Sequence, residues 1–180
     1  MESIPPYPNK HTGTCIVAGS AWCLEDDLER ARSLIGDVPV VAVNGAASLV
    51  KAVMLVSQHP DRFEVLGWRR KQIALYGNAF TTHAPGTGGH GVDYWWPIRK
   101  GGGSAWCARK IASLVGFSRV ILCGCPMEPG PYVGNHNLGG FMHRQDVVDE
   151  LMSQIERDSQ WHEGACSMSG KTRALLGEPC

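Results

Sequence analysis

Residues 119–124, RVILCG, form an apolar run in which no polar residue alternates with the hydrophobic ones. Strands that are buried on both faces show this pattern, because helices cover both sides of a parallel sheet. The preceding segment, SAWCARKIASLVG (104–116), has the composition of a helix, and we expect Ser104 to be its N-cap. A helix that leads into a buried strand is the repeating unit of a doubly wound fold.

Further strands and helices alternate on either side of this unit. Apolar runs at 14–18, 38–43, 53–57 and 79–83 predict four more strands. Residues 24–35 predict a helix that stops at Gly36, and 61–76 predict another in which Gly67 is a weak point. Seven glycines and two prolines between 84 and 103 predict a loop without regular structure for most of its length.

The C-terminal part continues the alternation. DVVDELMSQIERD (146–158) predicts a helix, 164–168 a last short strand, and SGKTRALLG (169–177) a terminal helical turn. The sequence therefore predicts one α/β domain, a doubly wound, Rossmann-like and mainly parallel sheet with helices on both faces. We expect residues 1–13 to be an N-terminal extension and 14–180 to be a Rossmann-like nucleotide-binding domain.

The composition limits the classes of partner. Lysine plus arginine and aspartate plus glutamate are both 17, so the charge does not indicate nucleic-acid binding. No run approaches the roughly 18 apolar residues of a membrane span, and the N-terminus has no signal-peptide pattern. We expect a cytoplasmic protein without membrane contact. Six tryptophans and six methionines make a homo-oligomer one alternative for its assembly.

Cysteine spacing gives little support for a metal. The seven cysteines are an odd number and several lie in apolar runs, which favours reduced thiols. Cys123 and Cys125 are two positions apart, but a structural zinc site needs a second matching pair of ligands, which the sequence lacks. We therefore expect no metal site.

Small and polar residues follow the predicted strands. In a doubly wound sheet, ligands bind outside the carboxyl ends of the strands. Gly19 and Ser20 follow the first strand, Asn44 and Gly45 the second, and Ser167 and Ser169 the last. We expect these six residues to contact a nucleotide.

KGGGS (100–104) is the strongest single motif for an anion. The start of a helix has unpaired N–H groups and a partial positive charge, and glycines ahead of it allow an anion to approach the backbone. The predicted contacts for a phosphate or carboxylate are Lys100, Gly101, Gly102, Gly103 and Ser104. A flexible hinge with an ordinary cap is the alternative, and neither a Walker loop nor GxGxxG is present.

Histidines gather in the segments that follow strands. Histidine can act as a general base near neutral pH because its ordinary pKa lies there. His59 follows the third strand, and His136 and His143 lie in a glycine-rich segment that could close over a ligand. We take these three as candidate bases, the alternative for each being a solvated loop histidine.

Four stretches carry a resemblance to known proteins: CIVAGSAWCLEDDLERA (15–31), VVAVNGAA (40–47), KGGGSAWCARKIASLVGFSRVILCGCPM (100–127) and SMSGKTRALLG (167–177). The chain resembles small phage and prophage proteins of a Rossmann-like group, which are similar to MptE-like pterin diphosphokinases and bacterial CMP-sialic-acid sialyltransferases. The resemblance implies that Gly19-Ser20 and Asn44-Gly45 contact a nucleotide and that a loop histidine acts as base toward an acceptor hydroxyl. Ala21-Trp22 stand where those enzymes tend to have Pro-Ser, and the aspartate pairs of a magnesium-dependent diphosphokinase are absent.

We therefore expect a nucleotide- or nucleotide-sugar-binding transferase of glycosyltransferase type, encoded by a phage and located in the host cytoplasm. Its only expected cofactor-like ligand is the nucleotide or nucleotide-sugar donor. A hydrolase of N-glycosidic or phosphate bonds is one alternative. A module that binds a nucleotide or a protein without turnover is the other.

Overall fold

The computed structural model describes residues 7, 11–88, 91–133 and 144–180. Seven strands form one parallel sheet in the order β5-β4-β3-β2-β1-β6-β7. The strands are β1 (Thr14–Ala18), β2 (Val40–Val43), β3 (Met54–Val56), β4 (Thr81–Pro85), β5 (Tyr94–Trp96), β6 (Arg119–Cys123) and β7 (Ala165–Ser167). This order confirms the predicted doubly wound, Rossmann-like α/β fold.

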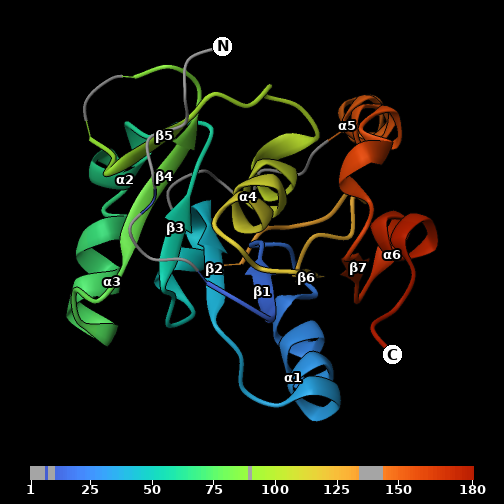
Figure 1. The fold of residues 1–180 in the computed structure, drawn as a ribbon, viewed down its shortest axis with the longest axis horizontal. Coiled ribbons are helices and arrows are strands. Elements are labelled where there is room, and N and C mark those ends of the chain that lie inside the picture. The colour runs from blue at the N-terminus through green and yellow to red at the C-terminus, as the bar shows by residue number, and fades with distance from the viewer. Residues whose placement is uncertain (1–6, 8–10, 89–90, 134–143) are drawn as a thin grey trace.

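Helices cover both faces of the sheet (Figure 1). They are α1 (Leu24–Ile35), α2 (Arg62–Val65), α3 (Trp68–Tyr76), α4 (Gly103–Leu114), α5 (Gln145–Arg157) and α6 (Gly170–Leu176), with short 3-10 turns η1 (Asn44–Ser48) and η2 (Ser159–Trp161). Among the described residues, the helices are too short or too polar to cross a membrane.

Two hydrophobic clusters, one on each face, explain why the strands lack alternation. Side chains of α4 and α5 pack on one face, against residues such as Val17 and Leu122. Side chains of α1, η1, α2 and α3 pack on the other, against neighbours such as Ile16 and Ile121. Successive strand residues point to opposite faces, so both sets must be apolar.

Three local predictions can be compared with the structure. Gly67 does interrupt the helix predicted over 61–76, because its backbone is left-handed at φ +66° between α2 and α3. The prediction that Ser104 caps its helix is wrong, since the cap position is taken by Gly102, two residues earlier and left-handed at φ +67°, and α4 begins at Gly103. Strand β5 was not predicted, because it has only three residues and lies in a glycine-rich segment.

The chain before β1 packs onto the core. Tyr7 lies edge-on to Tyr94 and against the ring of His83. His11 stacks on Phe117 and donates its backbone N–H to the carbonyl of Val115 at 2.9 Å. At least these parts of the predicted extension are therefore attached to the domain.

His83 lies in β4 and is fully buried. Trp96 donates its indole N–H to Nδ1 of His83 at 2.9 Å, so Nε2 carries the proton and donates to the Thr81 hydroxyl at 2.8 Å. Burial is the main cause that lowers the pKa of His83, to about 3. A neutral imidazole is thus part of the folded core.

This buried histidine makes stability depend on pH. Its folded pKa is below the ordinary value of 6.5, so its contribution is complete above pH 6.5 and is lost as pH falls toward 3. Between pH 7 and pH 5 we expect the free energy of unfolding to fall by about 2 kcal/mol through His83. Urea unfolding of the wild type and His83→Asn, whose side-chain oxygen can accept from Trp96, measures the difference. An equal pH slope in both proteins would contradict the assignment.

Candidate functional site

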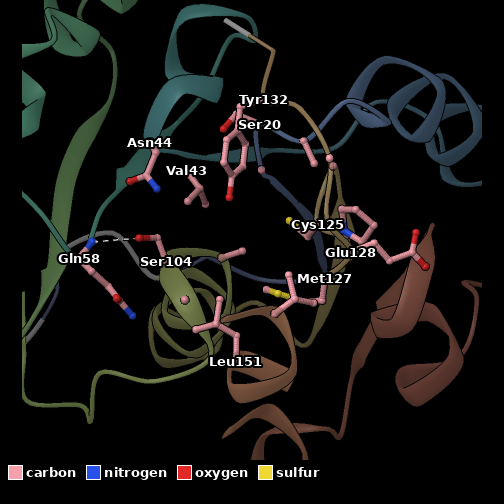
Figure 2. Close-up of a pocket in the computed structure, with 18 of the residues that line it drawn as sticks. Ser20, Val43, Asn44, Gln58, Ser104, Cys125, Met127, Glu128, Tyr132 and Leu151 are labelled. Carbon is pink, nitrogen blue, oxygen red and sulfur yellow. Dashed lines mark hydrogen bonds between the residues drawn. The ribbon is translucent and has the colours of Figure 1, made fainter. Parts of the chain in front are cut away.

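A cavity of about 380 Å³ lies at the carboxyl ends of β1, β2, β3 and β6. Strands β2, β3, β4 and β5 follow one another on one side of β1, whereas β6 and β7 lie on its other side. The strand order therefore reverses between β1 and β6. Ligands of doubly wound folds bind at this reversal. Helices α4 and α5 and the segment after β6 complete the walls (Figure 2).

The inner end of the cavity depends on two glycines that touch. Gly19 N–H donates to the Cys123 carbonyl at 2.8 Å. A Cβ on Gly19 would lie 2.4 Å from the carbonyl oxygen of Gly124, and a Cβ on Gly124 would lie 2.6 Å from that of Gly19. Any side chain at either position would separate β1 from β6 where the cavity begins.

Asp27, which is buried on α1, forms hydrogen bonds to the same part of the chain, at Gly124. Its Oδ2 accepts the backbone N–H of Gly124 at 2.8 Å and the hydroxyl of Ser169 at 2.7 Å. Asp27 is 2% exposed, so water cannot replace these donors readily. One carboxyl group therefore connects α1, the end of β6 and the start of α6.

The serines after β7 belong to this internal network. Ser167 is fully buried, and its hydroxyl forms a hydrogen bond of 2.8 Å with the Thr172 hydroxyl. Ser169 is engaged by Asp27 and lies 3.3 Å from the Cys23 sulfur. Neither serine lines the cavity. The structure therefore separates Ser167 and Ser169 from the predicted nucleotide contacts that do line it.

The N-terminal turn of α4 enters the cavity, but only part of the glycine-rich motif does. Gly103 and Ser104 line it, whereas Lys100, Gly101 and Gly102 do not. Gly102 N–H is taken by Oε1 of Gln154 at 2.8 Å. The glycines thus have a packing role that the sequence did not reveal.

Gly102 shows that packing role most clearly. A Cβ on Gly102 would lie 2.7 Å from side-chain atoms of both Ile155 and Trp106. The bare backbone therefore lets the start of α4 approach α5. The hydroxyl of Ser104, instead of capping the helix, accepts the backbone N–H of Gln58 at 3.3 Å (Figure 2).

Of the three candidate bases, His59 lines the cavity. His136 and His143 lie outside the described residues. The hydroxyl of Ser57 accepts the backbone N–H of His59 at 2.9 Å and fixes its position after β3. Burial, and then the positive charge of Arg62, lower the pKa of His59, with a further contribution from Lys100. His59 is thus neutral at pH 7.

The end of β2 contributes Asn44, which lines the cavity (Figure 2). Its backbone is left-handed at φ +51°. Gly45, the next residue, is buried behind it and does not line the cavity. The cavity thus brings together six of the predicted residues: Gly19, Ser20, Asn44, His59, Gly103 and Ser104.

Several cavity residues were not predicted. Gln58 lies two residues after β3, and Cys125 and Met127 lie two and four residues after β6, so the strand-end rule, extended over these segments, finds them. Arg62, Trp68, Glu128, Tyr132, Val148 and Leu151 come from helices or loops whose position the sequence does not show. Tyr132 is brought in by a bridge to Ala21, and burial raises its pKa to about 12, so its hydroxyl keeps its proton.

The buried thiols near the cavity are unreactive. Burial raises the pKa of Cys23 to about 11, and it also raises the pKa of Cys123 and Cys125. The nucleophilic thiolate is therefore absent at neutral pH. In the part of the chain that the structure describes, histidine, cysteine and acidic side chains do not gather in threes as metal ligands.

The fold and the cavity define a doubly wound α/β domain with a site at its strand reversal. Comparisons with models of protein families, with curated proteins and with solved structures found no match.

The contact between α1 and β6 can be tested through Asp27. Asp27→Ala leaves the Gly124 N–H and the Ser169 hydroxyl without their acceptor, and we expect it to lower the free energy of unfolding by about 2–3 kcal/mol. Asp27→Asn keeps one acceptor oxygen and should cost less. The neighbouring exposed Asp26 is the control, with a change within about 0.5 kcal/mol for Asp26→Ala. Equal effects at the two positions in chemical denaturation would contradict the role of Asp27.

Proposed function

We propose that the cavity binds a nucleotide or nucleotide-sugar and that the protein is a transferase of glycosyltransferase type. The observation that supports this most is the place of the cavity, at the reversal of strand order between β1 and β6. At this place the backbones of Gly19 and Gly124 come close together and the first turn of α4 points inward. Nucleotides bind at this position in many doubly wound folds.

The phosphate end of the ligand is assigned to the start of α4. The helix has 12 residues, and Gly103, Ser104 and Ala105 of its first turn line the cavity. The first N–H groups of a helix have no acceptor within the helix and carry a partial positive charge. Arg62 lines the same cavity, and Arg62 and Lys100 both lie near enough to His59 to lower its pKa. Their two positive charges are therefore on the side of the cavity where the neutral His59 lies.

The remaining walls suit the base or sugar of the ligand. Met127, Val148 and Leu151 supply apolar surface, and Trp68 supplies an aromatic ring. Glu128 lies near Met127, across the cavity from Asn44 and Gln58, with its carboxyl group turned outward (Figure 2). Pockets for small ligands combine mostly apolar walls with a few polar groups in this way.

His59 is the described residue that can serve as base. A neutral imidazole takes the proton of an acceptor hydroxyl while that oxygen bonds to the sugar carbon, and the bond from that carbon to the phosphate oxygen breaks. The phosphate leaves with the electron pair of this bond. The N–H groups of α4 then stabilise its charge. His136 and His143 stay alternative candidates.

Hydrolysis is the second candidate function, because water can enter the same cavity in place of the acceptor hydroxyl and His59 can take its proton. Analysis of products separates the two, since transfer needs an acceptor and hydrolysis releases the free sugar or base. A binding module without turnover would retain the ligand and yield no product. Phage origin is proposed from the resemblance alone, and a cytoplasmic location stays an expectation from the sequence.

Binding is tested first, by thermal shift and calorimetry with CMP, UDP, UMP, NAD, ADP-ribose and their sugar conjugates, with and without Mg²⁺. At about 100 times its dissociation constant a ligand should stabilise the fold by roughly 2.7 kcal/mol. Ala105→Asp places a negative charge in the first turn of α4, where it suits the helix but repels an anion. We expect at least a tenfold loss of affinity, and little change for the neutral Ala105→Asn. The absence of binding to every nucleotide would overturn the proposal and favour a protein partner.

The role of His59 is tested by turnover. His59→Ala should lower kcat by about 10²–10⁴-fold while the affinity for the nucleotide changes little. Because the pKa of His59 is lowered, the wild-type rate should rise with pH below about 6.5 and be level at neutral pH. A rate for His59→Ala within twofold of the wild type would transfer the role to another residue.

A further inference from the structure

Arg62 brings an unpaired guanidinium group to the wall of the cavity. It is the first residue of α2, is half-buried and lines the cavity. In the described part of the chain, its side chain forms no ion pair with a carboxyl group. A guanidinium group has five N–H donors in a planar fork that matches the oxygens of a phosphate. These donors are therefore available to an anionic ligand.

The charge around Arg62 is positive on balance. Burial lowers the pKa of His59 most, and three nearby charges then act on it: Arg62 lowers it, Asp61 raises it less, and Lys100 lowers it. Lys100 also forms no ion pair with the carboxyl groups of the described residues. A negative group beside Arg62 would therefore meet two unpaired cations and one carboxylate.

Trp68 adds a second donor to the same wall. It lines the cavity and is 2% exposed, and a buried indole N–H usually has an acceptor. The N–H of Trp68 has no acceptor among the described residues, yet it is not one of the atoms sealed from solvent without a partner. The small exposed part of Trp68 therefore includes this N–H, at a residue that lines the cavity.

Two hydrogen bonds connect this wall to the start of α4. The backbone N–H of Gln58 donates to the Ser104 hydroxyl at 3.3 Å (Figure 2). The backbone N–H of Arg62 donates to the His59 carbonyl at 3.0 Å. The segment from Gln58 to Arg62 therefore leads from the first turn of α4, to which the phosphate is assigned, to the unpaired guanidinium group.

We infer that the ligand carries two linked phosphates, the inner one at the start of α4 and the outer one held by Arg62 and the Trp68 N–H. This inference rests on the proposed function and makes the donor a nucleoside diphosphate or its sugar conjugate. A single phosphate at α4 leaves Arg62 without a counter-ion, whereas a diphosphate supplies one through its bridging oxygen. The outer phosphate is then beside His59, the proposed base, and the sugar of a conjugate is bonded to this phosphate.

The inference is tested by calorimetry with UMP and UDP, CMP and CDP, AMP and ADP, and phosphate and pyrophosphate. EDTA is present, so that a metal ion cannot bridge the phosphates. For the base that binds, the wild type should prefer the diphosphate to the monophosphate by at least about tenfold, and it should prefer pyrophosphate to phosphate. Arg62→Gln should bind the two forms within about twofold of each other, with an unchanged affinity for the monophosphate.

Two further variants make the test specific. Trp68→Phe keeps an aromatic ring and removes the N–H, so it should weaken binding of the diphosphate several-fold and leave that of the monophosphate unchanged. Arg69→Gln removes a neighbouring guanidinium group that is paired with Glu64 at 3.8 Å, and it should keep the wild-type preference. Thermal unfolding checks that each variant is folded.

The outcomes separate this inference from the proposed function. If the wild type binds a nucleotide but treats its mono- and diphosphate alike, the inference is wrong and nucleotide binding stands. If Arg62→Gln keeps the wild-type preference, the outer phosphate lies elsewhere and the inference is wrong as well. If pyrophosphate binds through Arg62 but no nucleotide does, the proposed function fails and the diphosphate site stands. If none of the eight compounds binds, both fail.

Discussion

The contact between the backbones of Gly19 and Gly124 is the constraint on which the rest of the site depends. It brings the ends of β1 and β6 together where the sheet changes direction. Asp27 maintains the contact from the opposite side by accepting the N–H of Gly124. A wider separation at this point would move the turn at Ser20 away from the segment that follows β6, and these two segments form the cavity.

Most of the fold could be predicted because its signals are local. The run at 119–124 needs only its own residues to show that both faces are buried, and Gly67 breaks a helix through its own backbone. Strand β5 was missed because three residues provide too little pattern among glycines. The cap at Ser104 was misplaced because Gly102, whose N–H is accepted by Gln154 on another helix, takes the cap position of α4.

The site was predictable to the extent that it follows from connectivity. Gly19, Asn44 and His59 each come directly after a strand, and the sheet brings them to one edge. Ser167 and Ser169 come after a strand too, but the buried Asp27 and Thr172 take up their hydroxyls. Arg62 and Leu151 reach the cavity from helices whose packing no local pattern defines. The sequence thus indicates which edge of the sheet carries the cavity. Which polar side chains line the cavity, and which ones bond to other parts of the protein, is seen only from the three-dimensional contacts.

The Asp27 network also has a consequence for the order in which the molecule is completed. The two donors that Asp27 accepts are 97 and 142 positions further along the chain. During synthesis this carboxyl group therefore enters the growing domain long before either donor exists. The cavity is one of the last features to be assembled, so any ligand of the cavity can stabilise the finished chain but not its nascent N-terminal part. A truncated product would have neither the site nor the stabilisation that a ligand provides.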